Sequence, residues 1–213
     1  MVMKGKLITF EGVEGGGKST QAVMLTQKLR SLGYEVLTTR EPGGTPTGEI
    51  IRDILQNDKS GEPISPATEA LLFCASRAQL CHYVLGPALE RGAWIVLDRF
   101  TDSTLAYQGY GRGFDVEALR RINDFATGDV KPALTFLIDI PVELGLSRVL
   151  SRSNGARDRI EREPIEFHHR LYAGYLEIAK HEPDRIVVID GEKKQLEIAE
   201  EIWSIVNSRL IND

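Results

Sequence analysis

Gly12-Val-Glu-Gly-Gly-Gly-Lys-Ser19 is the stretch of the sequence that decides the fold. It matches the phosphate-binding pattern G-x-x-x-x-G-K-[ST] at every position. It directly follows the apolar stretch Leu7–Phe10 and directly precedes a segment, Gln21–Leu32, with apolar residues at helical spacing. In a strand, loop and helix of this kind, backbone N–H groups and the positive end of the helix face a phosphate. The stretch therefore predicts a P-loop; a glycine-rich turn that only caps a helix is the weaker alternative.

Five β-rich stretches alternate with stretches of helical periodicity along the chain. This alternation predicts a parallel sheet with helices packed on it. We therefore expect an α/β P-loop NTPase fold, a three-layer αβα arrangement with a five-stranded parallel sheet, as one domain over residues 1–213. The expected strands are Lys6–Glu11, Tyr34–Thr39, Trp94–Asp98, Leu134–Asp139 and Ile186–Asp190.

Composition excludes several functional classes. The 213 residues carry 26 Lys and Arg against 31 Asp and Glu, a net charge of −5. An acidic balance of this kind argues against a nucleic-acid-binding surface. Arginine nevertheless outnumbers lysine, 17 to 9, and arginine suits bidentate recognition of phosphate. The arginines are therefore candidates for binding small phosphorylated ligands.

The sequence also favours a cytoplasmic protein with no membrane partner. The chain has no apolar stretch of the length that a membrane span or a signal peptide requires. Its two cysteines, Cys74 and Cys81, lie in an expected helix that begins at Ser65-Pro66 and is stopped or bent at Gly86-Pro87. Seven helical residues separate them by roughly 10 Å, too far for a disulfide, so both are expected to be reduced.

The P-loop suggests a role for each of its polar residues. Lys18 adds a mobile positive charge, and the Ser19 hydroxyl would bind Mg²⁺, with Asp98 at the end of a neighbouring strand completing the site. Glu14 is anomalous, because a carboxylate about 6 Å from a phosphate charge is repelled by about 3 kcal/mol at a dielectric of 20. We expect Glu14 to meet a cation or a hydroxyl on the acceptor side; a solvated loop acid is the alternative.

Other blocks choose among the classes of P-loop protein. The Asn/Thr-Lys-x-Asp element with which switch GTPases read guanine is absent from the sequence. From Lys6 to about Ile205, the chain closely resembles the bacterial type of the thymidylate kinase family. The blocks that carry the resemblance are Phe10–Lys18, Thr39–Thr45, Leu72–Gln79, Asp98–Gly109 and Asp158–Glu161.

The resemblance implies transfer of the γ-phosphoryl group of ATP to dTMP, giving dTDP for dTTP synthesis, with Mg²⁺ and in a homodimer. The implied ATP-binding residues are Gly12, Val13, Glu14, Gly15, Gly16, Gly17, Lys18, Ser19 and Thr20. The implied dTMP-binding residues are Glu41, Pro42, Arg52, Phe73, Arg77, Arg99, Thr104, Tyr107 and Gln108. The implied catalytic residues are Lys18, Arg99, Glu14, Arg152 and Arg157, and the implied metal ligands are Ser19 and Asp98.

The residue types fit these implied roles. An aromatic ring such as Phe73 can stack on thymine for ~1–3 kcal/mol. Arg77 and Gln108 offer hydrogen-bond groups to the edge of the base, and two arginines, Arg99 and Arg52, can neutralise the acceptor phosphate. Tyr107 would exclude a 2′-hydroxyl. The alternatives are a core phenylalanine, a surface arginine, a loop glutamine and a salt bridge from Arg99 to Asp98.

The resemblance further implies a mobile lid at about residues 148–162 that closes over ATP. Five arginines crowd this segment, and one of them would supply the positive charge that the P-loop lacks between Gly12 and Gly17; we favour Arg152 or Arg157. Ser76 and Phe100 depart from the family pattern without touching the phosphate chemistry. The arginines of the segment are Arg148, Arg152, Arg157, Arg159 and Arg162.

Two rival functions remain. One is a kinase that acts on another nucleoside monophosphate or on a deoxynucleoside. The other is a regulatory switch that hydrolyses nucleotide slowly and signals through its loops. The acceptor requirement separates these possibilities, because a switch forms ADP without any acceptor.

Overall fold

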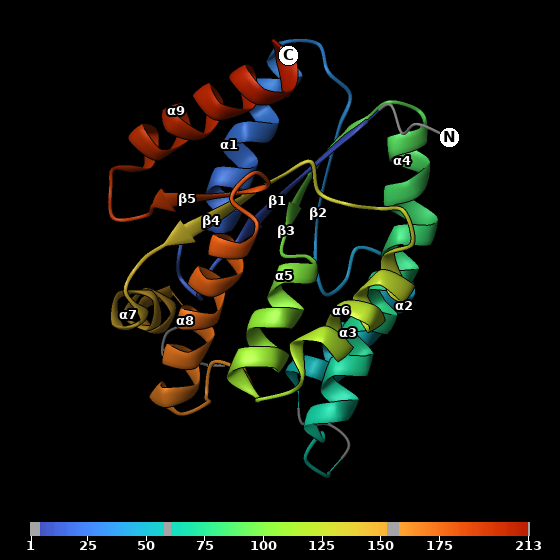
Figure 1. The fold of residues 1–213 in the computed structure, drawn as a ribbon, viewed down its shortest axis with the longest axis vertical. Coiled ribbons are helices and arrows are strands. Elements are labelled where there is room, and N and C mark those ends of the chain that lie inside the picture. The colour runs from blue at the N-terminus through green and yellow to red at the C-terminus, as the bar shows by residue number, and fades with distance from the viewer. Residues whose placement is uncertain (1–4, 58–60, 153–157, 213) are drawn as a thin grey trace.

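A computed structural model of the chain describes residues 5–57, 61–152 and 158–212, except for the side chain of residue 152 (Figure 1). Five strands form one sheet in the order β2-β3-β1-β4-β5, and every neighbouring pair is parallel. The strands are β1 (Lys6–Glu11), β2 (Val36–Arg40), β3 (Trp94–Asp98), β4 (Leu134–Asp139) and β5 (Ile186–Asp190). The sheet confirms the expected fold class.

Four of the five strands have the expected bounds, and β2 differs. It begins at Val36, which pairs with Trp94, instead of at Tyr34. Tyr34 lies after the end of α1 (Lys18–Ser31) and caps it, because its N–H donates to the Leu29 carbonyl at 3.3 Å. Its ring packs against Trp94, with 5.0 Å between the ring centroids. An aromatic residue at this point therefore closes the helix onto the sheet and does not extend the strand.

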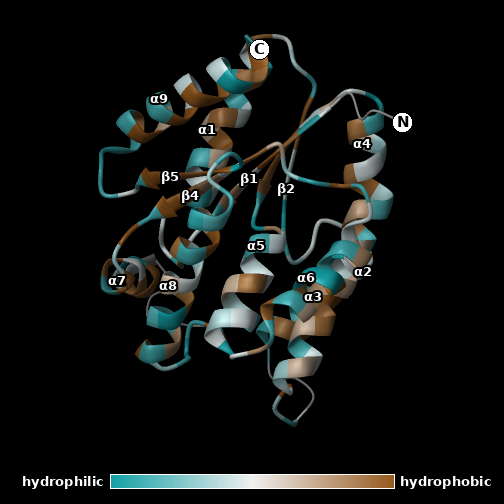
Figure 2. Ribbon diagram, viewed as in Figure 1, coloured by the Kyte–Doolittle hydropathy of each residue, from teal (hydrophilic) through white to brown (hydrophobic). Residues whose placement is uncertain are grey.

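One face of the sheet is covered by α1 (Lys18–Ser31) and α9 (Gln195–Val206), and a π-helical turn η3 (Asn207–Ile211) follows α9. In Figure 1 these two helices lie together beside β4 and β5. The side chains buried between these helices and the sheet include Phe10, Phe136 and Ile202. Figure 2 shows the strands as hydrophobic and the helices as mixed along their length, which is typical of helices that bury one face only.

The opposite face carries further helices, in two core clusters, and α7 (Val142–Arg152) packs in a third, smaller cluster with Val13 and Ile140. Leu7, Ile95 and Leu97 pack against the helices from α3 (Pro66–Leu80) to α4 (Gly86–Glu90). Leu137 and Ile186 pack against α8 (Ile165–His181) and η2 (Leu105–Gly111). Helices on both faces complete the three layers that the alternation predicts. These elements are α2 (Pro46–Gln56), α3 (Pro66–Leu80), η1 (Cys81–Leu85), α4 (Gly86–Glu90), α5 (Thr101–Thr104), η2 (Leu105–Gly111), α6 (Val116–Thr127), α7 (Val142–Arg152) and α8 (Ile165–His181).

The helix that begins at Ser65-Pro66 continues further than expected. Its start is confirmed, because the Ser65 Oγ accepts the Thr68 N–H at 3.1 Å and Pro66 is the first helical residue. The sequence predicts that Gly86-Pro87 stops or bends the helix; it does not stop there, because the helical path continues through the π-helical turn η1 (Cys81–Leu85) into α4 (Gly86–Glu90). Pro87 has no N–H to donate to the preceding turn, and it lies within the first turn of α4, directly after η1. Both cysteines are buried and free.

The P-loop lies between β1 and α1, packed against β4 and α7. A Cβ atom on Gly12, at φ +130°, would lie 2.5 Å from the Ile138 carbonyl oxygen, and one on Gly15, at φ +71°, would lie 2.2 Å from that of Gly145. Glycine is required at both positions by conformation and by space. Within the described ranges, every helix is too short or too polar to cross a membrane.

We predict that Phe136→Ala lowers the free energy of unfolding by about 3–5 kcal/mol. Phe136 is fully buried, and its ring centroid lies 5.5 Å from that of Phe10. The control is Leu196→Ala, since Leu196 on α9 is 69% exposed and its loss should cost no more than about 0.5 kcal/mol. Urea unfolding measures both values, and equal effects would contradict this account of the core.

Candidate active site

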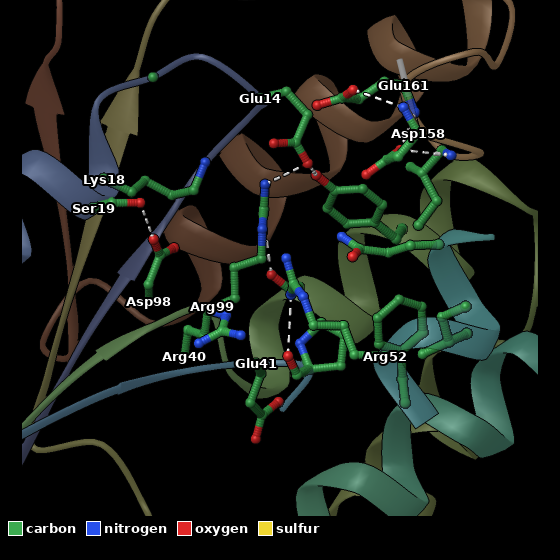
Figure 3. A pocket seen from close by; sticks show the side chains of 18 of the residues that line it. Glu14, Lys18, Ser19, Arg40, Glu41, Arg52, Asp98, Arg99, Asp158 and Glu161 are labelled. Atoms are coloured by element: carbon green, nitrogen blue, oxygen red, sulfur yellow. Dashed lines mark hydrogen bonds and ion pairs between the residues drawn. The ribbon is translucent and has the colours of Figure 1, made fainter. Parts of the chain in front are cut away.

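A cavity of about 550 Å³ opens at the carboxyl ends of β1, β2 and β3 (Figure 3). Its lining joins the P-loop, the β2–α2 loop, α2, α3, the end of α5, η2, and both ends of the lid segment. The sequence-predicted residues that line it are Glu14, Gly15, Gly16, Gly17, Lys18, Ser19, Thr20, Glu41, Pro42, Arg52, Phe73, Arg77, Asp98, Arg99, Thr104, Tyr107 and Gln108.

Four sequence-predicted residues are not part of the lining that the structure describes. Gly12 and Val13 are at the start of the P-loop, on the side away from the cavity, where they border a small space against Ile138 on β4. Arg152 is the last residue of α7, and its side chain lies outside the described part of the chain. Arg157 also lies outside the described residues.

Lys18 is folded back onto its own loop. Its Nζ donates to the carbonyl oxygens of Gly12 at 3.1 Å and Val13 at 2.7 Å. Burial, together with repulsion from Arg99, lowers the pKa of Lys18 to about 8, although Glu14 and Asp98 act in the opposite direction. The two carbonyl contacts are weak partners for a full charge, so phosphate oxygens entering the loop would compete for this ammonium group.

Ser19 and Asp98 lie together at one side of the cavity (Figure 3). The Ser19 hydroxyl donates a short hydrogen bond to Asp98 Oδ2. Two oxygen-bearing side chains suit Mg²⁺, because this ion keeps several waters and takes its other ligands from substrate phosphates. The described residues contain no group of three or more His, Cys, Asp or Glu side chains that could hold a metal unaided. The donor set therefore fits a magnesium ion that binds together with a nucleotide.

Glu14 meets a cation and a hydroxyl, as expected from its position in a phosphate loop. Its Oε1 accepts hydrogen bonds from Arg99 Nη2 at 2.6 Å and from the Tyr107 hydroxyl at 2.8 Å. Burial raises the pKa of Glu14, but the charges of Arg99 and Lys18 outweigh it and the pKa falls to about 2. Figure 3 shows this pair between the Lys18 side of the cavity and the Asp158 side.

A second positive group lies where β2 leads into α2. Arg52 lines the cavity and donates from Nη1 to the Pro42 carbonyl at 3.1 Å. Burial and repulsion from Arg40 lower the pKa of Arg52, while Glu49 and Asp158 partly compensate. This part of the cavity therefore has an excess of positive charge that an anion would relieve.

Arg77 is 1% exposed, and protein acceptors occupy all of its N–H donors. Glu41 Oε2 takes contacts from Nε at 2.8 Å and from Nη2 at 2.6 Å. The other acceptors are Thr104 Oγ1 and Asn123 Oδ1, both at 2.7 Å, and the Phe100 carbonyl at 2.9 Å. The sequence predicts that Arg77 offers free donors to a base, so any such contact has to replace one of these.

Gln108 has a fixed amide orientation. Its Nε2 donates to Glu69 Oε1 at 2.9 Å, and Glu69 also meets Arg112 at 3.0 Å and Arg159 at 2.5 Å. Burial raises the pKa of Glu69, but the hydrogen bonds from Arg112 and Gln108 outweigh this effect and the pKa is lowered. An ionised carboxylate only accepts hydrogen bonds. The Gln108 Nε2 is therefore committed to Glu69, and its Oε1 is the group available to the cavity.

The lid segment contacts the site from two sides. Arg148 on α7 lines the cavity and donates from Nη1 to the Gly15 carbonyl at 3.4 Å. Asp158, Ile160 and Glu161 also line the cavity. Asp158 Oδ1 accepts the N–H groups of Ile160 and Glu161 at 2.9 and 2.8 Å, so it organises a turn at the site. Among the lid arginines whose side chains the structure describes, which are Arg148, Arg159 and Arg162, Arg148 is the one with a hydrogen bond to the P-loop.

Sequence reasoning missed three carboxylates that organise this region: Glu11, Glu69 and Asp158. Glu11 and Glu69 are buried acids, and each collects hydrogen bonds from distant parts of the chain. Two of them lie in sequence blocks that carry the family resemblance. Glu11 directly precedes the P-loop, and Asp158 stands three residues before Glu161, the spacing of a capping turn. Glu69 had no signal apart from its position near the start of a helix.

The family model that describes thymidylate kinase matches residues 10–202. The chain is 49% identical over 203 residues to thymidylate kinase of Synechococcus sp. (strain JA-2-3B'a(2-13)), a match that covers 95% of both chains. It is 51% identical over 191 residues to thymidylate kinase of Geobacter sp. (strain M21), covering 88% of this chain and 84% of that one.

The fold matches a solved member as well. The crystal structure of thymidylate kinase from Ehrlichia chaffeensis superposes with a TM-score of 0.76 and 32% sequence identity, covering 95% of this chain and 98% of that chain. The family model and these relatives extend over nearly the whole sequence, including the P-loop and the cavity lining. The chain therefore belongs to the thymidylate kinase family.

Proposed function

We propose that this site transfers the γ-phosphoryl group of ATP to dTMP and releases ADP and dTDP, which serves dTTP synthesis. The observation that carries the proposal is a single cavity with a P-loop at one end, an aromatic and amide lining at the other, and Arg99 between them. Such an arrangement suits two nucleotides that meet at their phosphates. Membership of the thymidylate kinase family supports the same reaction.

The donor end would hold ATP on residues 12–20. The backbone N–H groups of the loop bind phosphate oxygens, and Lys18 leaves the Gly12 and Val13 carbonyls to meet them. Ser19 and Asp98 would hold Mg²⁺, which when bound neutralises charge on the phosphate oxygens. These residues orient the donor phosphates, and the reaction needs no covalent intermediate on the protein.

The acceptor phosphate would lie between Arg99 and Arg52. Both cations line the cavity, and their charges allow a second anion to approach the ATP phosphates. Glu14 keeps the Arg99 guanidinium paired when no substrate is present. Its carboxylate and the Tyr107 hydroxyl lie on the acceptor side, where they are in reach of a sugar.

The base would lie between Phe73 and the polar groups around it. Gln108 presents its Oε1, which accepts the imino proton of thymine but repels the N3 lone pair of cytosine. Arg77 would reach a base carbonyl by exchanging its bond to Thr104, which also lines the cavity. Glu41 and Pro42 complete this wall.

A lid arginine would supply the remaining positive charge at the transferred phosphoryl group. Arg152 and Arg157 remain the candidates that the sequence favours. Arg148 joins them, because its guanidinium contacts the Gly15 carbonyl in the P-loop. Closure of residues 148–162 over ATP would exclude water from the transfer.

We further propose a homodimer in the cytoplasm. Helix α2 packs against α3, and α3 packs against α6. Each of the three leaves large apolar side chains exposed, and Phe125 on α6 is 92% exposed. Exposed apolar side chains gathered on adjoining helices are typical of a protein interface. The others are Ile50 and Ile54 on α2 and Leu71 on α3.

An acceptor panel tests the reaction. With ATP and Mg²⁺, we expect rapid ADP release with dTMP and little with dCMP or UMP, because the Gln108 Oε1 repels N3 of cytosine and Tyr107 excludes a 2′-hydroxyl. Coupled detection of ADP measures the rates, with acceptor-free enzyme as the control. ADP formation that is independent of acceptor would favour a switch, and equal use of UMP and dTMP would exclude the thymidylate assignment.

The low pKa of Glu14 predicts an acid-sensitive contribution to stability. A carboxylate whose pKa falls from 4.5 to about 2 on folding stabilises the folded state above pH 4.5 and loses this contribution as the pH falls towards 2. The full contribution is up to ~3 kcal/mol. Urea unfolding at pH 6 and pH 3.5 should show a larger loss of stability for the wild type than for Glu14→Gln. Equal losses of stability in the wild type and in Glu14→Gln would mean that folding does not lower the pKa of Glu14.

The interface is tested by charge substitution. We expect the wild type to have the mass of a dimer, and Phe125→Glu or Leu71→Glu to shift it towards the monomer, because a carboxylate buried at an apolar interface is strongly unfavourable. Size-exclusion chromatography with light scattering measures the mass. Leu196→Glu on α9, at a site that is also exposed, is the matched control and should remain dimeric. A monomeric wild type would contradict the proposal.

A further inference from the structure

Glu11 is a buried carboxylate that lies beneath the cavity, at the end of β1. It is 1% exposed, and both of its oxygens are fully engaged. Oε1 accepts the backbone N–H groups of Phe100 at 2.7 Å and Ser103 at 3.3 Å. Oε2 accepts the Ser103 hydroxyl at 2.6 Å and the Tyr175 hydroxyl at 3.0 Å. All of these contacts surround Arg99 in sequence or in space.

The carboxylate determines which way the two hydroxyl groups point. An ionised carboxylate only accepts, whereas a hydroxyl has one proton to donate and lone pairs to accept with. The two hydroxyl oxygens also lie 2.9 Å from each other, and either can donate in that contact. A hydroxyl that donates its proton to Oε2 leaves its oxygen as an acceptor. Arg99 Nη1 lies 3.4 Å from the Ser103 oxygen and 3.2 Å from the Tyr175 oxygen. Glu11 thereby turns two neutral hydroxyl groups into acceptors for a guanidinium.

The same carboxylate also holds the backbone at Arg99. Arg99 has φ +68°, a left-handed conformation that residues with a Cβ seldom adopt. Its N–H donates to the Phe10 carbonyl at 3.0 Å, and the next N–H, that of Phe100, donates to Glu11. Residues 10 and 11 therefore hold this turn from both sides. Glu11 thus contacts the backbone beside Arg99 directly and the guanidinium through two hydroxyl groups.

The relay requires the ionised form of Glu11, and the surrounding charges act on that form in both directions. Burial and the neighbouring Asp102 raise the pKa of Glu11 to about 7, while the Ser103 hydrogen bond, Arg99 and the Phe100 N–H act against them. A buried acid in such surroundings is unfavourable unless hydrogen bonds and a cation offset its desolvation. Arg99 is that cation, although no direct contact joins the two side chains in the described structure.

We propose that Glu11 is a positioning residue for Arg99, acting through Ser103 and Tyr175 to fix where the guanidinium meets the acceptor phosphate. This inference rests on the proposed function, in which Arg99 binds the phosphate of dTMP. The relay anchors the Nη1 side of the guanidinium, together with the Gly12 carbonyl at 3.1 Å. The Nη2 side, paired with Glu14, is left towards the substrate.

Two variants break the relay at different points. In Glu11→Gln, the amide oxygen can keep the backbone N–H groups, but the NH₂ group donates to the hydroxyl oxygens. The hydroxyl protons must then point elsewhere, and towards Arg99 they meet a positive charge. In Tyr175→Phe, one acceptor of Nη1 is removed while the ring stays. The matched control is Tyr172→Phe on the same helix, because the Tyr172 hydroxyl bonds to Asp139 and not to this relay.

The test measures KM for dTMP and for ATP, and kcat, in each variant. We expect Glu11→Gln and Tyr175→Phe to raise KM for dTMP about ten-fold, with KM for ATP changed less than two-fold. Tyr172→Phe should change neither value. A merely structural role would lower the amount of active enzyme and leave both KM values as they are. If Glu11→Gln fails to fold, Tyr175→Phe carries the test.

A double-mutant cycle with Arg99→Ala decides whether the effect passes through Arg99. We expect Arg99→Ala to weaken dTMP binding, and Glu11→Gln or Tyr175→Phe to add less than two-fold in that background. Effects that multiply would overturn the relay, and so would variants that leave KM for dTMP unchanged although Arg99→Ala raises it. If Arg99→Ala itself leaves dTMP binding unchanged, the phosphate role of Arg99 in the proposed function fails, and the relay fails with it.

Discussion

The ion pair between Arg99 and Glu14 is the interaction on which the rest of the site depends. A phosphoryl-transfer site needs buried cations, and a buried cation without a partner is strongly unfavourable. Three of the arginines in and around the site are each paired with a glutamate: Arg99 with Glu14, Arg77 with Glu41, and Arg112 with Glu69. The acidic net charge of −5 and the arginine-lined cavity are therefore compatible, because many of the acids serve as partners for the arginines.

The fold brings these pairs together at one edge of the sheet. Strands β1 and β3 lie side by side in parallel, so Glu11 and Asp98 end near each other and the P-loop emerges beside the Arg99 turn. Helices α3 and α8 then place Arg77 and Tyr175 against that turn. Each charged group is thus held by a strand end on one side and by a helix on the other, which is the geometry of ligand sites in open parallel sheets.

The sequence predicted the features that local pattern encodes. Strand periodicity identified β1, β3, β4 and β5, and the glycines of the P-loop identified the phosphate end. The sequence pattern placed Tyr34 in the second strand. In the structure Tyr34 lies between α1 and β2, where its ring packs against Trp94. Glu11 and Glu69 could not be assigned, since their partners lie 39 to 164 residues away. Nor could sequence show that the donors of Arg77 are already occupied.

The fully occupied guanidinium of Arg77 has a consequence for ligand design. A compound that hydrogen-bonds to this arginine exchanges one acceptor for another of similar strength, so the contact adds selectivity for shape and polarity but little affinity. The unpartnered Oε1 of the buried Glu41 is different, because the described protein gives it no donor. That oxygen is shielded from solvent, so only an inhibitor that shifts the surrounding side chains and brings an N–H group to it would satisfy this buried acceptor.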